Sequence, residues 1–349
     1  MRNFILIGLL TVLLIVGCAK ASDPTDTTKG VLREVTRVPL NGDGISIDIS
    51  DSYIAVAEFD AGISLIDRNT FDRTWYTEIV GMDDNSVLNL ARNRVINLVE
   101  DLGFLLFTEE QDADNYRIVD LTQTDTLKIV SSILGGTFAI RQLELYQYTD
   151  PNPTEFENFT ARGFYVNDNK VTEVGWNSAI NLIQGFGDQS GWSYPVRRIY
   201  GADMTDNYVF AAAGQRGVFI SDRQNYNILT EFGTPGEALN LKIKGNYLYV
   251  ACRQSGIRVY NISDIYNVKE VYSYDTTGYA QNLDVNDNYA VLASGGGNLY
   301  LYNVSDPENI RFVERQTSTG YTNSVKIDKD NRVYVGTRDD GVVIFDINR

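Results

Sequence analysis

The chain repeats itself towards its C-terminal end. Residues 247–264 read YLYVACRQSGIRVYNISD, residues 289–306 read YAVLASGGGNLYLYNVSD, and residues 332–347 read RVYVGTRDDGVVIFDI. The pattern returns after 42 and then 43 residues. A period near forty residues, with several short alternating strands in each unit, is typical of a propeller blade. The repeat therefore predicts an all-β fold, a β-propeller.

The same order of features extends towards the N-terminus, where it defines further units. Each unit has a polar turn, an apolar strand, a short loop, an alternating third strand and a more polar fourth strand. The units span approximately residues 45–80, 88–134, 138–184, 196–232, 238–275, 280–316 and 322–349. The sequence thus predicts seven four-stranded blades in one domain, residues 31–349.

The last unit has only three strands, and residues 31–38 form an extra strand at the other end of the domain. We expect this strand to pair with residues 342–345, because closure of the last blade removes an exposed sheet edge. The second and third units match the repeat poorly. A ring of six blades, or an additional hairpin near residues 148–162, is therefore the alternative.

The N-terminus has the pattern of an export signal. A short positive start is followed by an apolar run, residues 4–16, that is too short to span a membrane. The run ends in Ile15-Val16-Gly17-Cys18, which resembles a bacterial lipobox. The resemblance implies a signal peptide over residues 1–17 and acylation of Cys18, with residues 18–30 as a flexible tether. An ordinary secretory signal with a chance cysteine is the alternative.

Composition excludes several kinds of partner and chemistry. The net charge is −16 at pH 7, so the molecule repels nucleic acid and anionic lipid, and membrane contact is expected only through the lipid anchor. The chain has no histidine, which rules out a histidine base, a serine–histidine–aspartate triad and imidazole metal ligands. No metal or cofactor is expected, and Cys252 is interpreted as a small buried residue.

A family resemblance is carried by residues 246–264, in which NYLYVA is followed by a short loop and by GIRVYNISD. This unit resembles the LVIVD repeat of bacterial exported proteins. The resemblance is good over the last three units, fair over the first and fourth, and weak over the second and third. Asn298 and Asn115 stand where the repeat usually has glycine, which asparagine can replace because it also reaches left-handed backbone angles. The resemblance implies a β-propeller and supplies no catalytic motif.

Several polar patterns have a structural explanation. One aspartate or asparagine ends the third strand of most units, and the blades are too far apart for these residues to share one ion. We expect them to cap their own turns: Asp67, Asp120, Asp222, Asn261, Asn303 and Asp346. The loop around Asp112 and Asp114 is interpreted as solvated, with a calcium site as the alternative. Residues 295–297 are interpreted as a tight turn, and Glu58 with Asp60 as an ordinary pair of carboxylates.

The predicted ligand-facing surface is the end of the ring where the loops between second and third strands meet the connections between blades. These loops bring arginine and aromatic residues, which are common at binding hot spots, into an acidic molecule. The candidates are Phe59, Asp60, Gln215, Arg216, Arg253, Gln254, Arg338 and Asp339 in the first set of loops, and Trp192, Tyr194, Tyr279 and Tyr321 in the second. The bland alternative is that they pack against one another.

These features predict a lipid-anchored, extracytoplasmic binding or protein-interaction module of the bacterial cell envelope. Its partner would be an envelope protein or a glycan, and its location the outer membrane or cell surface. One alternative is an envelope hydrolase or glycan-processing enzyme that uses carboxylates at the mouth of the propeller. Another is a structural subunit that docks through the divergent third unit.

Overall fold

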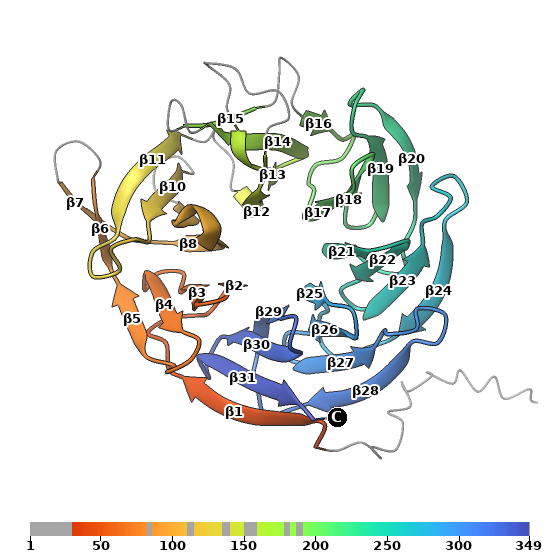
Figure 1. Cartoon of the computed structure of the whole chain (residues 1–349). Helices are drawn as coiled ribbons and strands as arrows, with labels where there is room; N and C mark the ends of the chain where they lie inside the picture. The colour runs from red at the N-terminus through yellow and green to blue at the C-terminus, as the bar shows by residue number, and fades with distance from the viewer. Residues whose placement is uncertain are drawn as a thin grey trace, which may run out of the picture.

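The structure is a computed structural model, and it describes residues 30–81, 86–109, 115–134, 140–149, 159–177, 182–185 and 191–348. Its strands form seven sheets arranged around a central axis (Figure 1). The predicted seven blades are confirmed, and the six-bladed alternative is wrong. In this part of the chain no helix is long and apolar enough to cross a membrane. The proposed signal peptide, Cys18 and most of the tether lie outside the described residues.

Four blades have the regular antiparallel order from the axis outwards. Blade 1 contains β2 (Ser46–Ile49), β3 (Tyr53–Ala57), β4 (Ile63–Asp67) and β5 (Arg73–Tyr76). Blade 4 contains β17 (Gly201–Met204), β18 (Tyr208–Ala212), β19 (Val218–Asp222) and β20 (Ile228–Phe232). Blade 5 contains β21 (Asn240–Lys244), β22 (Tyr247–Ala251), β23 (Ile257–Asn261) and β24 (Lys269–Tyr274). Blade 6 contains β25 (Asn282–Val285), β26 (Tyr289–Ala293), β27 (Leu299–Asn303) and β28 (Arg311–Gln316).

Blades 2 and 3 depart from this plan, as their weak repeats predict. Blade 2 contains β8 (Asn93–Val99), the 3-10 helix η1 (Glu100–Leu102), β9 (Phe104–Glu109), β10 (Asn115–Asp120) and β11 (Lys128–Leu134). The hairpin of β6 (Glu78–Val80) and β7 (Val87–Asn89) extends its outer edge. Blade 3 contains β12 (Ile140–Gln147), β13 (Phe159–Asn167), β14 (Lys170–Asn177), β15 (Leu182–Gly185) and β16 (Gly191–Ser193), and the last two both pair with β14. The insertion at 150–158 lies outside the described residues.

Blade 7 joins the two ends of the domain. It contains β29 (Thr322–Ile327), β30 (Arg332–Thr337) and β31 (Val342–Ile347), and β1 (Leu32–Val38) forms its outer strand (Figure 1). The register runs from Leu32 opposite Ile347 to Val38 opposite Val342. The backbone N–H of Leu32 also donates to the buried carboxylate of Glu314 in blade 6, at 2.9 Å. The predicted closure by residues 31–38 is therefore confirmed.

The core consists of apolar layers between neighbouring blades, because the middle strands of each blade are buried on both faces. One such layer joins Phe210 and Ile220 of blade 4 to Leu248 and Val250 of blade 5. The tight loops between second and third strands keep these layers in register. Gly256 and Asn298 close equivalent loops with φ of 67° and 74°, as expected for residues that tolerate left-handed backbone.

Polar side chains connect the blades at the axis. The free edge of each inner strand would leave backbone N–H groups unsatisfied. Side chains of the preceding inner strand accept hydrogen bonds from these groups. Asp48 of β2 accepts from Leu98 at 2.8 Å, and Asp203 of β17 accepts from Ile243 at 2.8 Å. The other acceptors are Ser46, Asn97, Gln142, Asn240, Asn282 and Asp284.

Blade 7 meets blade 1 through charged groups. Lys326 of β29 forms an ion pair with Asp48 at 2.9 Å, and Arg68 of blade 1 pairs with Asp328 of blade 7. The backbone N–H of Gly44 donates to the carbonyl of Thr337 at 2.9 Å. Blades 7 and 1 are thus joined by ion pairs and a backbone hydrogen bond. Among the described residues, no side chain of β29 accepts a hydrogen bond from the backbone of β2, unlike the contacts between the other neighbouring blades.

The axial ring places four carboxylates and two ammonium groups at corresponding positions of the inner strands. Lys242 of β21 pairs with Glu144 of β12 at 2.6 Å. Burial raises the pKa of Asp203 to about 6, against the lowering influence of Lys242. Burial also acts to raise the pKa of Glu144, but the charges of Lys242 and Lys326 outweigh it and lower that pKa. Asp203 therefore takes up a proton more readily than Glu144 in the folded state.

Deleting residues 31–38 should expose the edge of β31 and remove the Leu32–Glu314 hydrogen bond. We expect the loss of several kcal/mol of the free energy of unfolding, or aggregation through the new edge. Thermal melting and size-exclusion chromatography measure both. The control is Arg33→Ala, which alters an exposed ion pair of the same strand. A truncated protein that melts like the control would contradict the role of β1.

Asp203→Asn should alter the pH dependence of stability. The raised pKa of Asp203 stabilises the folded state fully below the unfolded-state pKa near 3.8, and this contribution is lost as pH rises through 6. The wild type should therefore lose about 1 kcal/mol relative to Asp203→Asn between pH 5 and pH 8. Urea titrations at both values measure the difference. Asp206→Asn, on an exposed turn of the same blade, should show no such change.

Candidate functional site: the arginine-lined mouth

We use the term mouth for the end of the ring at which the inner strands begin. The loops between second and third strands meet the blade-to-blade connections there. A cavity of about 1040 Å³ occupies its centre. Its walls come from all seven blades or their connections: Asp43, Ile45, Phe59, Arg94, Val95, Ile140, Arg141, Tyr200, Glu237, Leu239, Asn240, Arg253, Tyr279, Gln281, Asn282, Tyr321 and Asn323.

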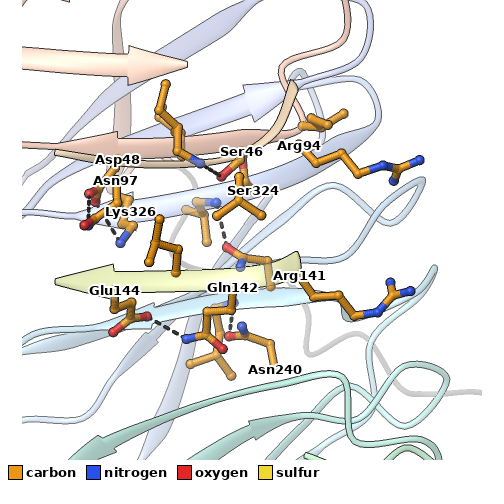
Figure 2. Close-up of a pocket in the computed structure, with 18 of the residues that line it drawn as sticks. Ser46, Asp48, Arg94, Asn97, Arg141, Gln142, Glu144, Asn240, Ser324 and Lys326 are labelled. Carbon is orange, nitrogen blue, oxygen red and sulfur yellow. Dashed lines mark hydrogen bonds and ion pairs between the residues drawn. The ribbon is translucent and has the colours of Figure 1, made fainter. Parts of the chain in front are cut away.

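A narrower space of about 150 Å³ continues along the axis between the inner strands. Figure 2 shows Arg94 and Arg141 at one end of this space, with Asp48, Glu144 and Lys326 towards the other. The charges of the inner strands are thus separated along the axis. Guanidinium groups lie at the mouth, and the ion-paired ring lies deeper.

Arginine side chains lie over aromatic rings around the rim. The guanidinium carbon of Arg253 is 5.1 Å from the ring centroid of Tyr279, and that of Arg338 is 4.1 Å from Tyr321. Arg94 lies 4.9 Å from the ring of Phe59. Such cation–π contacts keep rings and cations together at a partly exposed surface.

The loop backbone fixes these side chains. Phe59 and Arg253 both adopt positive φ, 51° and 40°, at the start of equivalent loops. Each is held by a β-bridge to a residue at or just before the inner strand of the next blade, Phe59 to Asn93 and Arg253 to Ala280. Non-glycine residues in this region are strained, and the bridges hold them there. The bridges therefore fix the backbone conformation of the rim at these two positions.

Arg141 lies at the start of β12, where the mouth narrows. Its Nε is buried and has no hydrogen-bond partner among the described residues. Burial, followed by the positive charges of Arg198 and Arg94, lowers the pKa of Arg141, while Tyr200 and Asp168 act in the opposite direction. The guanidinium still carries its charge at neutral pH, because its ordinary pKa is far above 7. The narrow part of the mouth therefore concentrates positive charge in an acidic protein.

The two carboxylates on the wall of the cavity lie beside arginines. Glu237 pairs with Arg253 at 2.7 Å, and Asp43 lies 3.9 Å from Arg338. Glu58 is fully buried; it pairs with Arg73 at 2.7 Å and accepts hydrogen bonds from the backbone of Asn41 and Gly42. Glu58 therefore anchors the connection between β1 and blade 1.

The structure brings four of the twelve predicted residues together in the cavity: Phe59, Arg253, Tyr279 and Tyr321. Gln215 and Arg216 line a neighbouring pocket with Arg198 and Tyr200. The loops around the cavity carry four more of the predicted residues: Asp60, Gln254, Arg338 and Asp339. Of these, Arg338 contacts the cavity wall, because its guanidinium lies over the ring of Tyr321.

Trp192 and Tyr194 do not face the mouth. Both are buried in the apolar layer between blades 3 and 4, with 1% and 2% of their surface exposed. Trp192 lies on β16 and donates from its indole to the carbonyl of Asp222, at 2.9 Å. The sequence places these residues between two units, but β16 folds back onto β14 and carries them into the core.

Sequence analysis missed Arg94, Arg141, Arg198 and Tyr200. Arg94 and Arg141 belong to the second and third units, where the weak repeat gives no strand register. All four residues lie at or just before the start of an inner strand. This shared position becomes visible only when the blades are aligned by their structure. Glu237 was also missed. It stands just before Ala238, in the position that Tyr279 takes before Ala280, and both alanines form equivalent β-bridges to the preceding blade.

The other polar patterns have local roles. Asp67, Asp120, Asp222, Asn261 and Asn303 accept hydrogen bonds from backbone groups of their own turns, and Asp346 pairs with Arg33 and Arg332. The predicted capping role is thus confirmed for five of the six. No group of three or more acidic or cysteine side chains within the described ranges could hold a metal ion. The loop of Asp112 and Asp114 lies outside those ranges.

Cys252 is a free, buried thiol at the end of the second strand of blade 5. Burial raises the pKa of Cys252 to about 12. The thiol is therefore protonated at neutral pH and unsuited to act as a nucleophile.

Comparisons with known proteins agree with this architecture. The LVIVD repeat family model matches residues 235–276 and 277–317. A crystal structure of the WD40 β-propeller domain of Doa1 superposes with a TM-score of 0.65 at 11% identity, covering 91% of this chain and 97% of that one. The computationally designed Ika8 protein superposes with a TM-score of 0.59 at 12% identity, covering 90% and 100%. No curated protein matches the chain.

The structural likenesses are too low in sequence identity to indicate more than the fold. The two matched repeats correspond to blades 5 and 6, with the connections that precede them. The chain is therefore a seven-bladed β-propeller that carries LVIVD repeats.

Proposed function

We propose that this protein is a lipid-anchored, extracytoplasmic binding module of the bacterial cell envelope, and that it holds its partner at the mouth without catalysing a reaction. The observation that carries the proposal is the rim of arginine–aromatic pairs around a cavity of about 1040 Å³. A propeller presents loops from every blade at such a cavity, and arginine and tyrosine are common hot-spot residues there.

The two carboxylates on the wall of the cavity support binding over catalysis. A hydrolase would need two carboxylates that face the same substrate, with one of them free to exchange a proton. Glu237 and Asp43 instead lie beside arginines. These pairs neutralise the carboxylates and hold the arginines at the rim.

The position of β1 fits an N-terminal anchor. Third strands start at the mouth loops, so Ile347 at the end of β31 lies at the opposite end of the ring. Leu32 pairs with Ile347, which places the start of β1 at that opposite end. A tether leading from Cys18 to residue 30 would join the domain there. The mouth would then face away from the membrane, accessible to an envelope protein or glycan.

Replacing rim arginines should weaken partner binding. The test is a pull-down from detergent-solubilised envelopes, with quantitative mass spectrometry of the recovered material. Arg253→Ala and Arg338→Ala should each reduce recovery of the partner by about fivefold or more, equivalent to 1 kcal/mol. Asp287→Ala, on an exposed turn at the opposite end, is the control and should have no effect. Equal effects of all three variants would show that the partner does not bind at the mouth.

Cys18→Ser should prevent acylation. The variant is expected in the soluble fraction, or retained with its signal peptide uncleaved. Mass spectrometry of the N-terminal peptide distinguishes these forms from the wild type, which should begin with a lipid-modified Cys18. A wild-type protein whose mature chain begins at another residue would refute the anchor, and the pull-down would remain a valid test of the mouth.

A further inference from the structure

We propose that the mouth binds an acidic oligosaccharide, with a sugar carboxylate held by Arg141 beside Arg94, and with sugar rings lying against the exposed tyrosines of the rim. This inference rests on the proposed function, because it assigns a ligand class to the same mouth. It goes further in naming the anion-binding group and the chemistry of the ligand.

The first argument is the charge of Arg141. Arg94 and Arg141 both line the cavity where it narrows, and the Nε of Arg141 is buried without a hydrogen-bond partner among the described residues. Like charges brought together in a partly buried site destabilise the protein unless an anion neutralises them. A guanidinium binds a carboxylate in bidentate fashion, which suits a planar anionic group at this position.

The second argument is the surface around this charge. Tyr279 is 48% exposed, and Phe59, Tyr200 and Tyr321 are each partly exposed on the cavity wall. Aromatic faces offer flat apolar area at little entropic cost, which suits the C–H faces of sugar rings. Polar side chains of Asn240, Gln281 and Asn282 line the same wall and can form hydrogen bonds with hydroxyl groups. The cavity volume lies just above the range usual for ligand pockets, which is about 300–1,000 Å³.

The third argument concerns the backbone of the rim, which favours a glycan over a peptide strand. Extended peptides commonly bind by adding a strand to an open sheet edge. At the mouth the loop backbones already pair with the next connection in four bridges, which join Phe59 to Asn93, Gly214 to Ala238, Arg253 to Ala280 and Gly295 to Thr322. Recognition there must therefore come from side chains.

The test is isothermal titration of the propeller domain with two oligosaccharides of equal length. Tetragalacturonate carries a carboxylate on each sugar, and maltotetraose carries none. We expect tetragalacturonate to bind at least tenfold more tightly, with affinity falling as salt is raised. Arg141→Gln should reduce its affinity tenfold or more, and Tyr279→Ala should reduce it less. Arg311→Gln, an exposed position on β28 near the opposite end, is the matched control and should leave it unchanged.

Folding and specificity are checked together. Arg141→Gln removes a repulsive charge, so its melting temperature should equal or exceed that of the wild type, and loss of binding cannot then be ascribed to unfolding. The inference is overturned if both oligosaccharides bind alike, if neither binds at millimolar concentration, or if Arg141→Gln binds as the wild type does. Equal binding of inorganic phosphate or polyglutamate would also overturn it. If neither oligosaccharide binds but Arg253→Ala still reduces recovery of a partner in the pull-down, the glycan ligand is refuted and the proposed function stands.

Discussion

The unpaired edge of each inner strand is the constraint on which the ring depends. A four-stranded sheet that points its first strand at the axis leaves that strand without a neighbour on one side, and its N–H groups cannot reach bulk water there. The chain meets this need with side chains of the preceding blade. Asp48, Asn97, Asp203 and Asp284 each accept a hydrogen bond from the inner strand of the next blade. Side-chain hydrogen bonds, rather than backbone pairing, thus connect the inner strand of each of blades 1 to 6 to the inner strand of the next blade.

This arrangement also determines the electrostatics of the axis. Carboxylates are good acceptors for backbone N–H groups, but several of them in a narrow space repel one another. Lys242 and Lys326 lie among them and form ion pairs with Glu144 and Asp48. Among the residues that the structure describes, Asp203 forms no such direct pair, and burial raises its pKa. The two ammonium groups therefore offset only part of the negative charge of the four carboxylates, and this ring lies deeper along the axis than Arg141.

The sequence predicts much of this fold and only part of the site. The repeated strands of blades 5 to 7 give the architecture, and the three-stranded last unit predicts the pairing of residues 31–38 with β31, because an open edge is unfavourable. The hairpin of β6 and β7, and the return of β16 onto β14, are not predictable from the repeat. They depend on contacts between segments whose spacing differs from the other units, and Trp192 and Tyr194 are buried as a consequence. Arg141 was missed for the same reason. An axial signal is present in retrospect, since a charged residue between apolar ones recurs at Asp48, Asp203, Lys242, Asp284 and Lys326.

The pairing of β1 with β31 also has a mechanical consequence. The segment preceding residue 30 enters the domain at the Leu32 end of β1, and the pairing then runs along the strand to Val38. A pull on that segment, directed away from the mouth, acts along the strand axis, whereas the inter-strand hydrogen bonds lie across it. All the rungs of the pairing are then loaded together in shear, and none can be peeled away before the others. A domain held by this end in a flowing or strained envelope would bear force on the pairing of β1 with β31 before any blade opened.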